Sequence, residues 1–162
     1  MVTQSCFCGS AFPFTQCCEP ILVGNQKAVT AEVLMRSRYS AYAIHNADYL
    51  IATTHSSTRA THSKNEILYW ATSNLWQRLE IIRVTSNTVE FKAFYFNSSK
   101  QLQVHHEHSR FVEENGEWKF FAWSCTTDPG KKSMVAFTNK NGVARLKEGQ
   151  YRGSHEIRKH QG

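Results

Sequence analysis

Four of the five cysteines lie within the first eighteen residues, in the pattern Cys6-x-Cys8-x8-Cys17-Cys18. Thiolates are preferred ligands of tetrahedral structural zinc, with Zn–S bonds of about 2.3 Å. A C-x-C turn followed by a returning C-C pair can present four sulfur atoms to one ion. We therefore predict that Cys6, Cys8, Cys17 and Cys18 bind zinc. Because four thiolates leave no open coordination position for water or substrate, we expect the ion to be structural.

The residues between the cysteines support this interpretation. Gly9 tolerates the positive φ that a chain looping around an ion requires, and Ser10 supplies a hydroxyl donor for a sulfur atom. The alternatives are disulfides or ordinary buried thiols. The adjacent Cys17 and Cys18 would pair only through a strained bond, and no apolar leader with a cleavage site precedes them. We therefore favour reduced cysteines that bind metal.

The composition indicates one domain with a small appendage. A chain of 162 residues can bury a real core, and no stretch approaches the roughly twenty apolar residues of a membrane span. We therefore expect a soluble, cytoplasmic protein. The net charge of +6 belongs to one end, because residues 1–128 contain 11 basic and 11 acidic residues whereas residues 129–162 contain 8 and 2.

The basic tail, residues 129–162, follows a turn-type break at Asp128-Pro129-Gly130. It has little apolar periodicity, so a solvated extension is expected. A tail of this charge can also bind nucleic acid, ribosomes or an acidic protein through salt-dependent contacts. Its one apolar stretch, Met134-Val-Ala-Phe137, could pack back on the body.

Periodicity divides the body into helices followed by strands. Thr30 is a suitable N-cap for an amphipathic helix over residues 31–53, and a second helix is predicted over residues 64–75. The pattern then changes to alternation and predicts strands at residues 78–85, 88–97, 100–113 and 117–126. In the second strand one face consists of Val89, Phe91, Ala93 and Tyr95. Helices followed by hairpin-linked strands indicate an α+β fold with the helices packed on one sheet face.

The last predicted strand carries aromatic side chains on both faces. Trp118 and Phe120 alternate with Phe121 and Trp123, so both faces must be covered. Helices would cover one face, and the tail or a second subunit would cover the other. A homodimer and a monomer covered by its tail are thus both open.

Two parts of the chain resemble a known family. The segment Cys-Phe-Cys-Gly-Ser-Ala-Phe-Pro-Phe-Thr-Gln-Cys-Cys, residues 6–18, resembles the SEC-C zinc-binding motif, whose usual form is C-x-C-G-S-G-K-x-Y/F-x-x-C-C/H. Residues 34–42, 47–50, 107–111 and 114–118 are similar to the YchJ-like family, in which a SEC-C motif precedes a nuclear-transport-factor-2-like domain. The resemblance implies a cone, in which a curved antiparallel sheet wraps around helices, with the four cysteines as zinc ligands.

The implied parts are a SEC-C motif at residues 1–26, the cone at residues 27–128 and the basic tail at residues 129–162. The motif departs from its usual form at Ala11 and Phe12, which stand in place of Gly-Lys. No basic residue precedes Lys27, so the motif lacks the charge that would steer it toward an acidic partner.

The implied cone can hold a pocket at its open end, and Glu107, Asp48 and His55 are the candidates for acid–base chemistry there. Glu107 shares strand parity with Phe111, so its carboxyl should face the apolar interior, where burial raises the pKa. The opposing interpretation, which we favour, is a structural ion pair between Glu107 or Asp48 and an arginine. The available arginines are Arg36, Arg38 and Arg110.

These observations favour an uncharacterised zinc-binding protein, in which the SEC-C loop fixes the N-terminus to a domain that binds a protein or a small molecule. One alternative is a small-molecule enzyme of the isomerase or dehydratase type, which needs only a pocket and a base. Another is a ribosome-associated or nucleic-acid-associated protein acting through its basic tail. The sequence contains no nucleophile elbow, phosphate loop or dinucleotide fingerprint, and we lean against an enzyme.

Overall fold

Alternating side chains fix which face of the sheet is buried. In the computed structural model, which describes residues 3–125, 134–138 and 144–148, strand β2 (Thr88–Phe96) buries every second residue. Those residues are the four predicted from the sequence, Val89, Phe91, Ala93 and Tyr95. The opposite face of β2 is half-buried, so the strand has one core side and one outer side.

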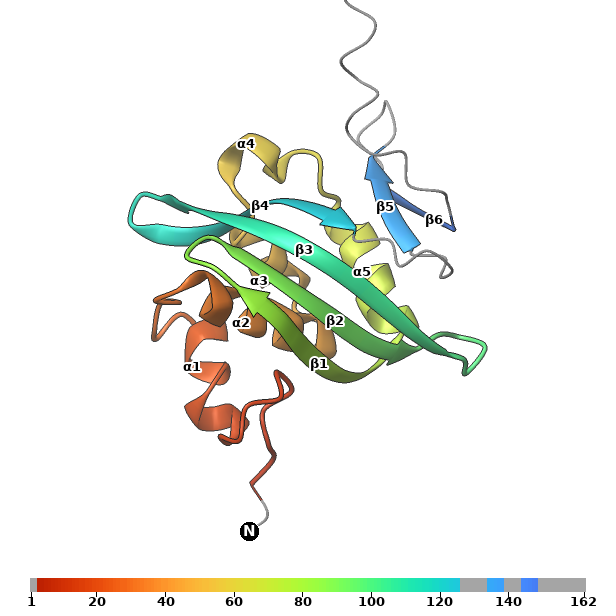
Figure 1. Ribbon diagram of the computed structural model, residues 1–162, viewed down its shortest axis with the longest axis horizontal. Helices are drawn as coiled ribbons and strands as arrows, with labels where there is room; N and C mark the ends of the chain where they lie inside the picture. The colour runs from red at the N-terminus through yellow and green to blue at the C-terminus, as the bar shows by residue number, and fades with distance from the viewer. Residues whose placement is uncertain (1–2, 126–133, 139–143, 149–162) are drawn as a thin grey trace, which may run out of the picture.

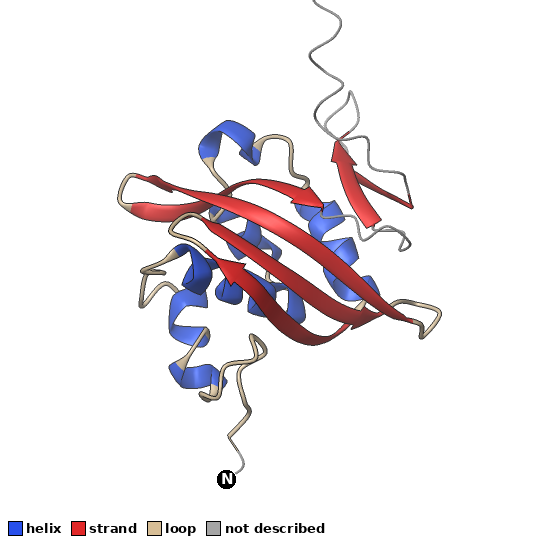
Figure 2. Cartoon of the chain, in the orientation of Figure 1, coloured by secondary structure: helices blue, strands red, loops and turns tan. Residues whose placement is uncertain are grey.

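Four consecutive strands form an antiparallel meander in the order β1-β2-β3-β4, and helices pack on its inner face (Figures 1 and 2). The strands are β1 (Leu75–Val84), β2, β3 (Leu102–Glu114) and β4 (Glu117–Cys125). Irregular register in β1 and at Arg110/Phe111 of β3 bends the sheet around the helices. The α+β architecture predicted from the sequence is confirmed.

The helices that line the sheet begin at polar caps. Thr30 caps the first long helix, because its hydroxyl accepts a hydrogen bond from the Val33 N–H at 3.1 Å. Ser63 caps the last helix in the same way through the Glu66 N–H. The elements are η1 (Phe14–Gln16), α1 (Glu19–Leu22), α2 (Ala31–Ala43), α3 (Ala47–Ala52), α4 (Ser56–Arg59) and α5 (Lys64–Ser73).

The single helix predicted over residues 31–53 is wrong, because the chain breaks it into α2 and α3. His45 adopts a left-handed conformation with φ of +64°, which ends the first helix. Asn46 then starts the second, since its side chain accepts a hydrogen bond from the Tyr49 N–H at 3.0 Å. The apolar stripe nevertheless continues across the break, where Ala47 and Leu50 are buried.

The main core lies between α2 and the sheet. Its buried residues are Ala31, Leu34, Met35, Tyr39, Leu79, Val89, Phe91, Ala93, Phe111 and Phe120. The second predicted helix should bury an apolar face that includes Leu68 and Ala71. This is only partly confirmed, because Ala71 is buried whereas Leu68 is exposed. Leu75, placed at the end of that helix, instead begins β1 and is exposed.

The segment between α3 and α4 runs beside the outer edge of β4. Thr54 forms a parallel bridge with Phe120, and the two backbones exchange hydrogen bonds of 2.8 Å through the neighbouring Thr53 and His55. On the outer face of the sheet, Arg110 covers the Phe121 ring at 4.9 Å. The side chain of Trp123, predicted to share that face, lies outside the described residues.

Part of the basic tail forms a hairpin rather than a plain extension. Strand β5 (Met134–Thr138), which contains the apolar stretch of the tail, pairs with β6 (Ala144–Glu148). The remainder of the predicted tail lies outside the described residues. Among the helices that are described, none combines the length and the apolar character needed to cross a bilayer.

The left-handed His45 gives a test of the helix break. We expect His45→Gly to raise the free energy of unfolding by about 0.5 kcal/mol, because glycine adopts positive φ without strain. Urea unfolding measures the change. The control Ala43→Gly, in the last turn of α2, should instead lower stability by up to about 1 kcal/mol. A less stable His45→Gly variant would contradict the account of the break.

Candidate functional site

The four cysteines of the N-terminal loop come together at one point. Their Sγ atoms all lie within 4.8 Å of one another, and all but Cys17 are buried. The Cys17 sulfur is 3.7 Å from that of Cys8 and 4.0 Å from that of Cys18. These distances are far longer than the roughly 2.05 Å of a disulfide, and all four thiols are free. One metal ion could therefore contact all four sulfur atoms.

A tight loop brings the first pair of cysteines beside the second. Gly9 has φ of +79° and donates its N–H to the Cys6 carbonyl at 3.2 Å, which closes the first turn. The predicted role of Ser10 is confirmed, because its hydroxyl lies 3.1 Å from the Cys17 sulfur. Such a contact orients a ligand atom from outside the coordination sphere.

Helix α2 supports the loop from behind. The Arg36 guanidinium donates to the Cys8 carbonyl at 2.8 Å and is held in turn by Glu32 at 3.1 Å. The Ser40 hydroxyl lies 3.8 Å from the Cys6 sulfur. Phe7 packs against the main core and also meets the Phe14 ring edge-on, so it joins the cysteine cluster to the body.

Close packing of the sulfur atoms shifts the pKa values of Cys8, Cys17 and Cys18. A hydrogen bond from Cys18 lowers the pKa of Cys8 to about 4, and the same contact raises the pKa of Cys18. Burial raises the pKa of Cys17 to about 11. The Cys8 thiolate is thus favoured beside protonated Cys17 and Cys18, and a cation bound to their sulfur atoms would release the protons of these two thiols.

Glu107 faces the interior of the cone, as the strand parity predicted. Its carboxylate lies 2.6 Å from His105 Nε2 and also accepts a hydrogen bond from the Ser109 hydroxyl. Burial acts to raise the pKa of Glu107, but the His105 and Ser109 hydrogen bonds, with the charge of Arg38, hold it below its ordinary value. The expectation of a raised pKa was therefore wrong, and no arginine forms an ion pair with Glu107 within the described residues.

Asp48 lies outside the cone. Its side chain is 79% exposed and forms an ion pair of 2.6 Å with Lys64 Nζ, at the start of α5. The structure therefore does not bring Asp48 and Glu107 together. The partner is a lysine, not one of the three arginines considered from the sequence.

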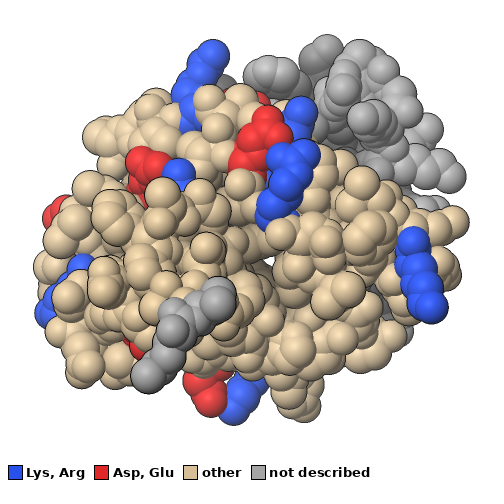
Figure 3. All heavy atoms as spheres, turned by 90° about the horizontal axis from the view of Figure 1, so that it is seen from below, with Lys and Arg blue, Asp and Glu red and all other residues tan. Residues whose placement is uncertain are grey.

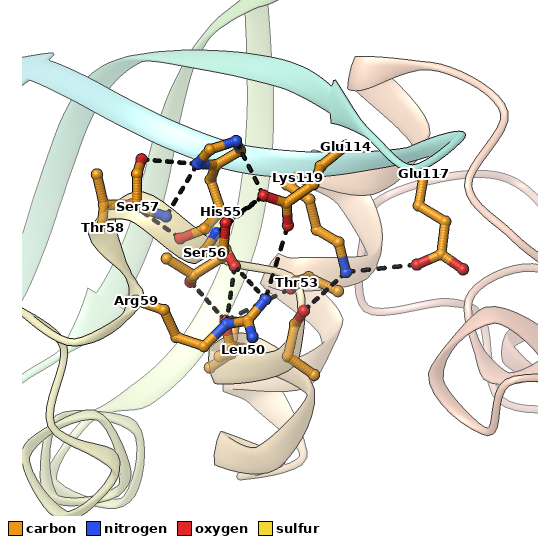
Figure 4. Close-up of polar contacts among 12 residues, drawn as sticks. Leu50, Thr53, His55, Ser56, Ser57, Thr58, Arg59, Glu114, Glu117 and Lys119 are labelled. Atoms are coloured by element: carbon orange, nitrogen blue, oxygen red, sulfur yellow. Dashed lines mark hydrogen bonds and ion pairs between the residues drawn. The ribbon is translucent and has the colours of Figure 1, made fainter.

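His55 holds α4 against the β3–β4 hairpin (Figure 4). Its Nδ1 accepts hydrogen bonds from the N–H and the hydroxyl of Ser57, at 3.1 and 2.7 Å. Its Nε2 then carries the proton and lies 3.0 Å from the Glu114 carboxylate. Glu114 also accepts hydrogen bonds from the N–H and hydroxyl of Ser56, with Arg59 at 3.9 Å. Nδ1 of His55 thus caps α4 and Nε2 contacts Glu114, so both nitrogens have structural partners.

Charges of both signs are interspersed over the body. In Figure 3 the basic and acidic side chains of the described residues alternate and do not gather into a patch of one sign on this face. Lys27 and Lys119 both pair with Glu117, at 3.0 and 3.4 Å. This distribution agrees with the balanced charge of residues 1–128.

Comparison with known proteins decides the family. The family model described as "YchJ, middle NTF2-like domain" matches residues 30–122, more than half of the chain. A UPF0225 protein of Geobacter sulfurreducens is 36% identical over 148 residues, which cover 87% of this chain and 88% of the relative. The chain belongs to the YchJ-like UPF0225 family. A further UPF0225 member, from Vibrio cholerae, is 40% identical over 71% of this chain and 79% of its own.

Solved structures agree with this membership of the YchJ-like family. A SEC-C motif containing protein of Rhodopseudomonas palustris, solved in solution, has a TM-score of 0.71 and 31% identity, covering 76% of this chain and all of that one. A crystal structure of a SEC-C motif containing protein of Psychrobacter arcticus has a TM-score of 0.62 and 26% identity, covering 83% and 89%. The predicted resemblance and the nuclear-transport-factor-2-like fold are confirmed.

Sequence reasoning missed two groups of polar residues in this YchJ-like chain. It did not pair Glu107 with His105, although their i±2 spacing places both on one face of a strand. It also missed the contact between His55 and Glu114, which are far apart in the sequence. No local pattern predicts that second contact.

Glu114 gives a test of the His55 assignment. The Ser56 hydrogen bond lowers the pKa of Glu114, so the carboxylate stabilises the fold above its unfolded pKa and loses this effect as the pH falls through its folded pKa. We expect Glu114→Gln to lower the melting temperature at pH 7, by a margin that shrinks as the pH is lowered toward 3. Thermal unfolding followed by circular dichroism measures this margin.

The exposed neighbour Glu113 provides the matched control, because it forms no ion pair among the described residues. Glu113→Gln should leave the melting temperature nearly unchanged at both pH values. A Glu114→Gln margin that stays constant with pH would contradict the role given to this carboxylate.

Proposed function

We propose that this protein is a structural zinc protein, in which one ion held by Cys6, Cys8, Cys17 and Cys18 fixes the SEC-C loop to the nuclear-transport-factor-2-like domain. The spacing of the sulfur atoms carries the proposal. Two pairs are separated by 3.7 and 4.0 Å, and a tetrahedron with Zn–S bonds of about 2.3 Å has edges of about 3.8 Å. Four sulfur ligands in this geometry select zinc or iron over harder cations.

The closed ligand set supports a structural role for the zinc. Bound zinc would cross-link two short segments of chain, residues 6–8 and 17–18, whose Cys8 and Cys17 sulfur atoms lie 3.7 Å apart without a covalent bond. Ser10 and Arg36 would orient the ligand turn, one through a sulfur atom and the other through the Cys8 carbonyl. Free, mostly buried thiols also fit a reducing compartment, and we propose the cytoplasm.

Metal analysis tests the ligand set. Protein purified without chelator should contain about one zinc per chain, and Cys8→Ser should reduce this to background, because a hydroxyl is a poor substitute for a thiolate. The matched control is Cys125→Ser, which changes the fifth cysteine of the chain, on β4, and should keep the zinc. Wild-type protein without stoichiometric zinc would sink the proposal, and iron in its place would correct the metal.

Chelation tests the structural role. The cysteine cluster is a small core of its own, separate from the main core and joined to it through few side chains. Removing zinc should therefore collapse the dispersion of the amide resonances of residues 5–18 while those of β2 and β3 keep their positions. Two-dimensional NMR of the labelled protein measures both. Unchanged resonances in the loop would show that the ion does not order it.

A further inference from the structure

The inside of the cone contains a polar cluster that the zinc proposal leaves unexplained. Arg38 and Tyr42 reach it from α2, one turn apart, while His105, Glu107 and Ser109 reach it from alternate positions of β3. The three β3 residues pair with the core-facing positions of β2, so they share the inner face of the sheet. Burying five polar side chains in an otherwise apolar layer costs free energy unless they form hydrogen bonds.

Glu107 is already satisfied within this cluster. One carboxylate oxygen meets His105 and the other meets Ser109, so the negative charge is fixed on β3. Arg38 is close enough to interact with that charge through space, yet the two groups form no ion pair. The buried cation therefore lies near the fixed anion without contacting it.

Among the described residues, only one nitrogen of the Arg38 guanidinium, Nη1, forms hydrogen bonds. Its Nη1 donates to the Leu50 carbonyl at 2.9 Å and to the Thr53 hydroxyl at 2.7 Å, which supports the end of α3. Its Nε and Nη2 atoms have no hydrogen-bond partner among the described residues, and Arg38 is only 8% exposed. That Nε–Nη2 edge is the one that binds a carboxylate through two parallel hydrogen bonds.

Tyr42 adds a third unused donor. Its hydroxyl has no hydrogen-bond partner within the described part of the chain, although it interacts electrostatically with both Arg38 and Glu107. Burial raises the pKa of Tyr42, so the hydroxyl keeps its proton and remains a donor. Aromatic rings surround the two donors, with Trp76 beside Tyr42 at 5.5 Å and Phe120 beneath the Arg38 guanidinium at 4.7 Å.

We propose that Arg38 and Tyr42 bind the carboxylate of a small organic monoacid, whose apolar body packs on the aromatic lining of the cone. The fixed charge of Glu107 would repel a second carboxylate, which limits the ligand to one negative group. This site is independent of the metal, so the proposal stands apart from the function proposed above.

A hollow elsewhere in the molecule is a less suitable site for an organic acid. It has a volume of about 180 Å³ and lies between the linker after α1 and the start of β4, with Tyr49 and Trp118 in its wall. Its two cations, Lys27 and Lys119, are already paired with Glu117. It therefore lacks a free positive group for an acid.

Sodium benzoate is the probe, titrated into the full-length zinc-loaded protein and followed by NMR of the backbone amides and the arginine Nε groups. We expect saturable shifts at Arg38 Nε and along residues 105–109, and binding of the neutral analogue benzamide at least about tenfold weaker, because it lacks the charge. Phthalate, with two carboxylates, should also bind more weakly than benzoate.

Two variants test the donors. Tyr42→Phe removes only the hydroxyl and should weaken benzoate binding by about five- to tenfold. Arg38→Lys keeps the charge but loses the paired N–H edge, and it should weaken binding by at least about tenfold. Because Arg38 also supports α3, thermal unfolding of both variants without ligand accompanies the titrations, and Tyr42→Phe decides the outcome where Arg38→Lys is unstable.

Three results would overturn the proposal. The first is the absence of saturable shifts at tens of millimolar benzoate, and the second is equal binding of benzoate and benzamide. The third is an unchanged benzoate affinity in a folded Tyr42→Phe variant. Loss of zinc on its own bears on the metal site and leaves these readouts intact.

Discussion

The packing of α2 between the cysteine loop and the sheet is the contact on which the rest of the molecule depends. One side of this helix holds the loop through Arg36 and Ser40. The opposite side places Leu34 in the main core and, one turn later, Arg38 in the cone. Residues two apart on a helix point in different directions, which lets neighbouring arginines serve separate sites. Displacing α2 would therefore disturb the cysteine cluster, the core and the interior polar residues together.

The molecule keeps two kinds of polar chemistry apart. Three of the four cysteines in the sulfur cluster are buried, and the ligands come from segments close in sequence. Inside the cone the polar groups come from α2 and β3, far apart in sequence, and Arg38 and Tyr42 keep donors that have no hydrogen-bond partner in the described part of the chain. The first arrangement suits a part that must stay closed, whereas the second suits one that receives something from outside. The aromatic core lies between them and is shared by both.

The structural features that were predicted correctly depend on residues close together in the sequence. Alternation in β2, the Thr30 cap and the cysteine spacing each depend on residues a few positions apart, and each matches the structure. The break at His45 was missed because the apolar stripe runs on through it, and only the Asn46 cap marks the new helix. The lowered pKa of Glu107 was not predicted, because burial raises the pKa of this carboxyl whereas its hydrogen bonds lower it. Which of the two prevails depends on side-chain positions that periodicity does not specify.

The segment after α3 has a consequence for how sheets of this kind meet other chains. An edge strand with free backbone groups is a template for pairing with a second copy. Here the backbone of residues 53–55 already occupies β4 at Phe120, from the side where another strand would add. The sheet is thereby closed at that point to extension by a neighbour, and association through the middle of β4 is blocked by the protein's own chain.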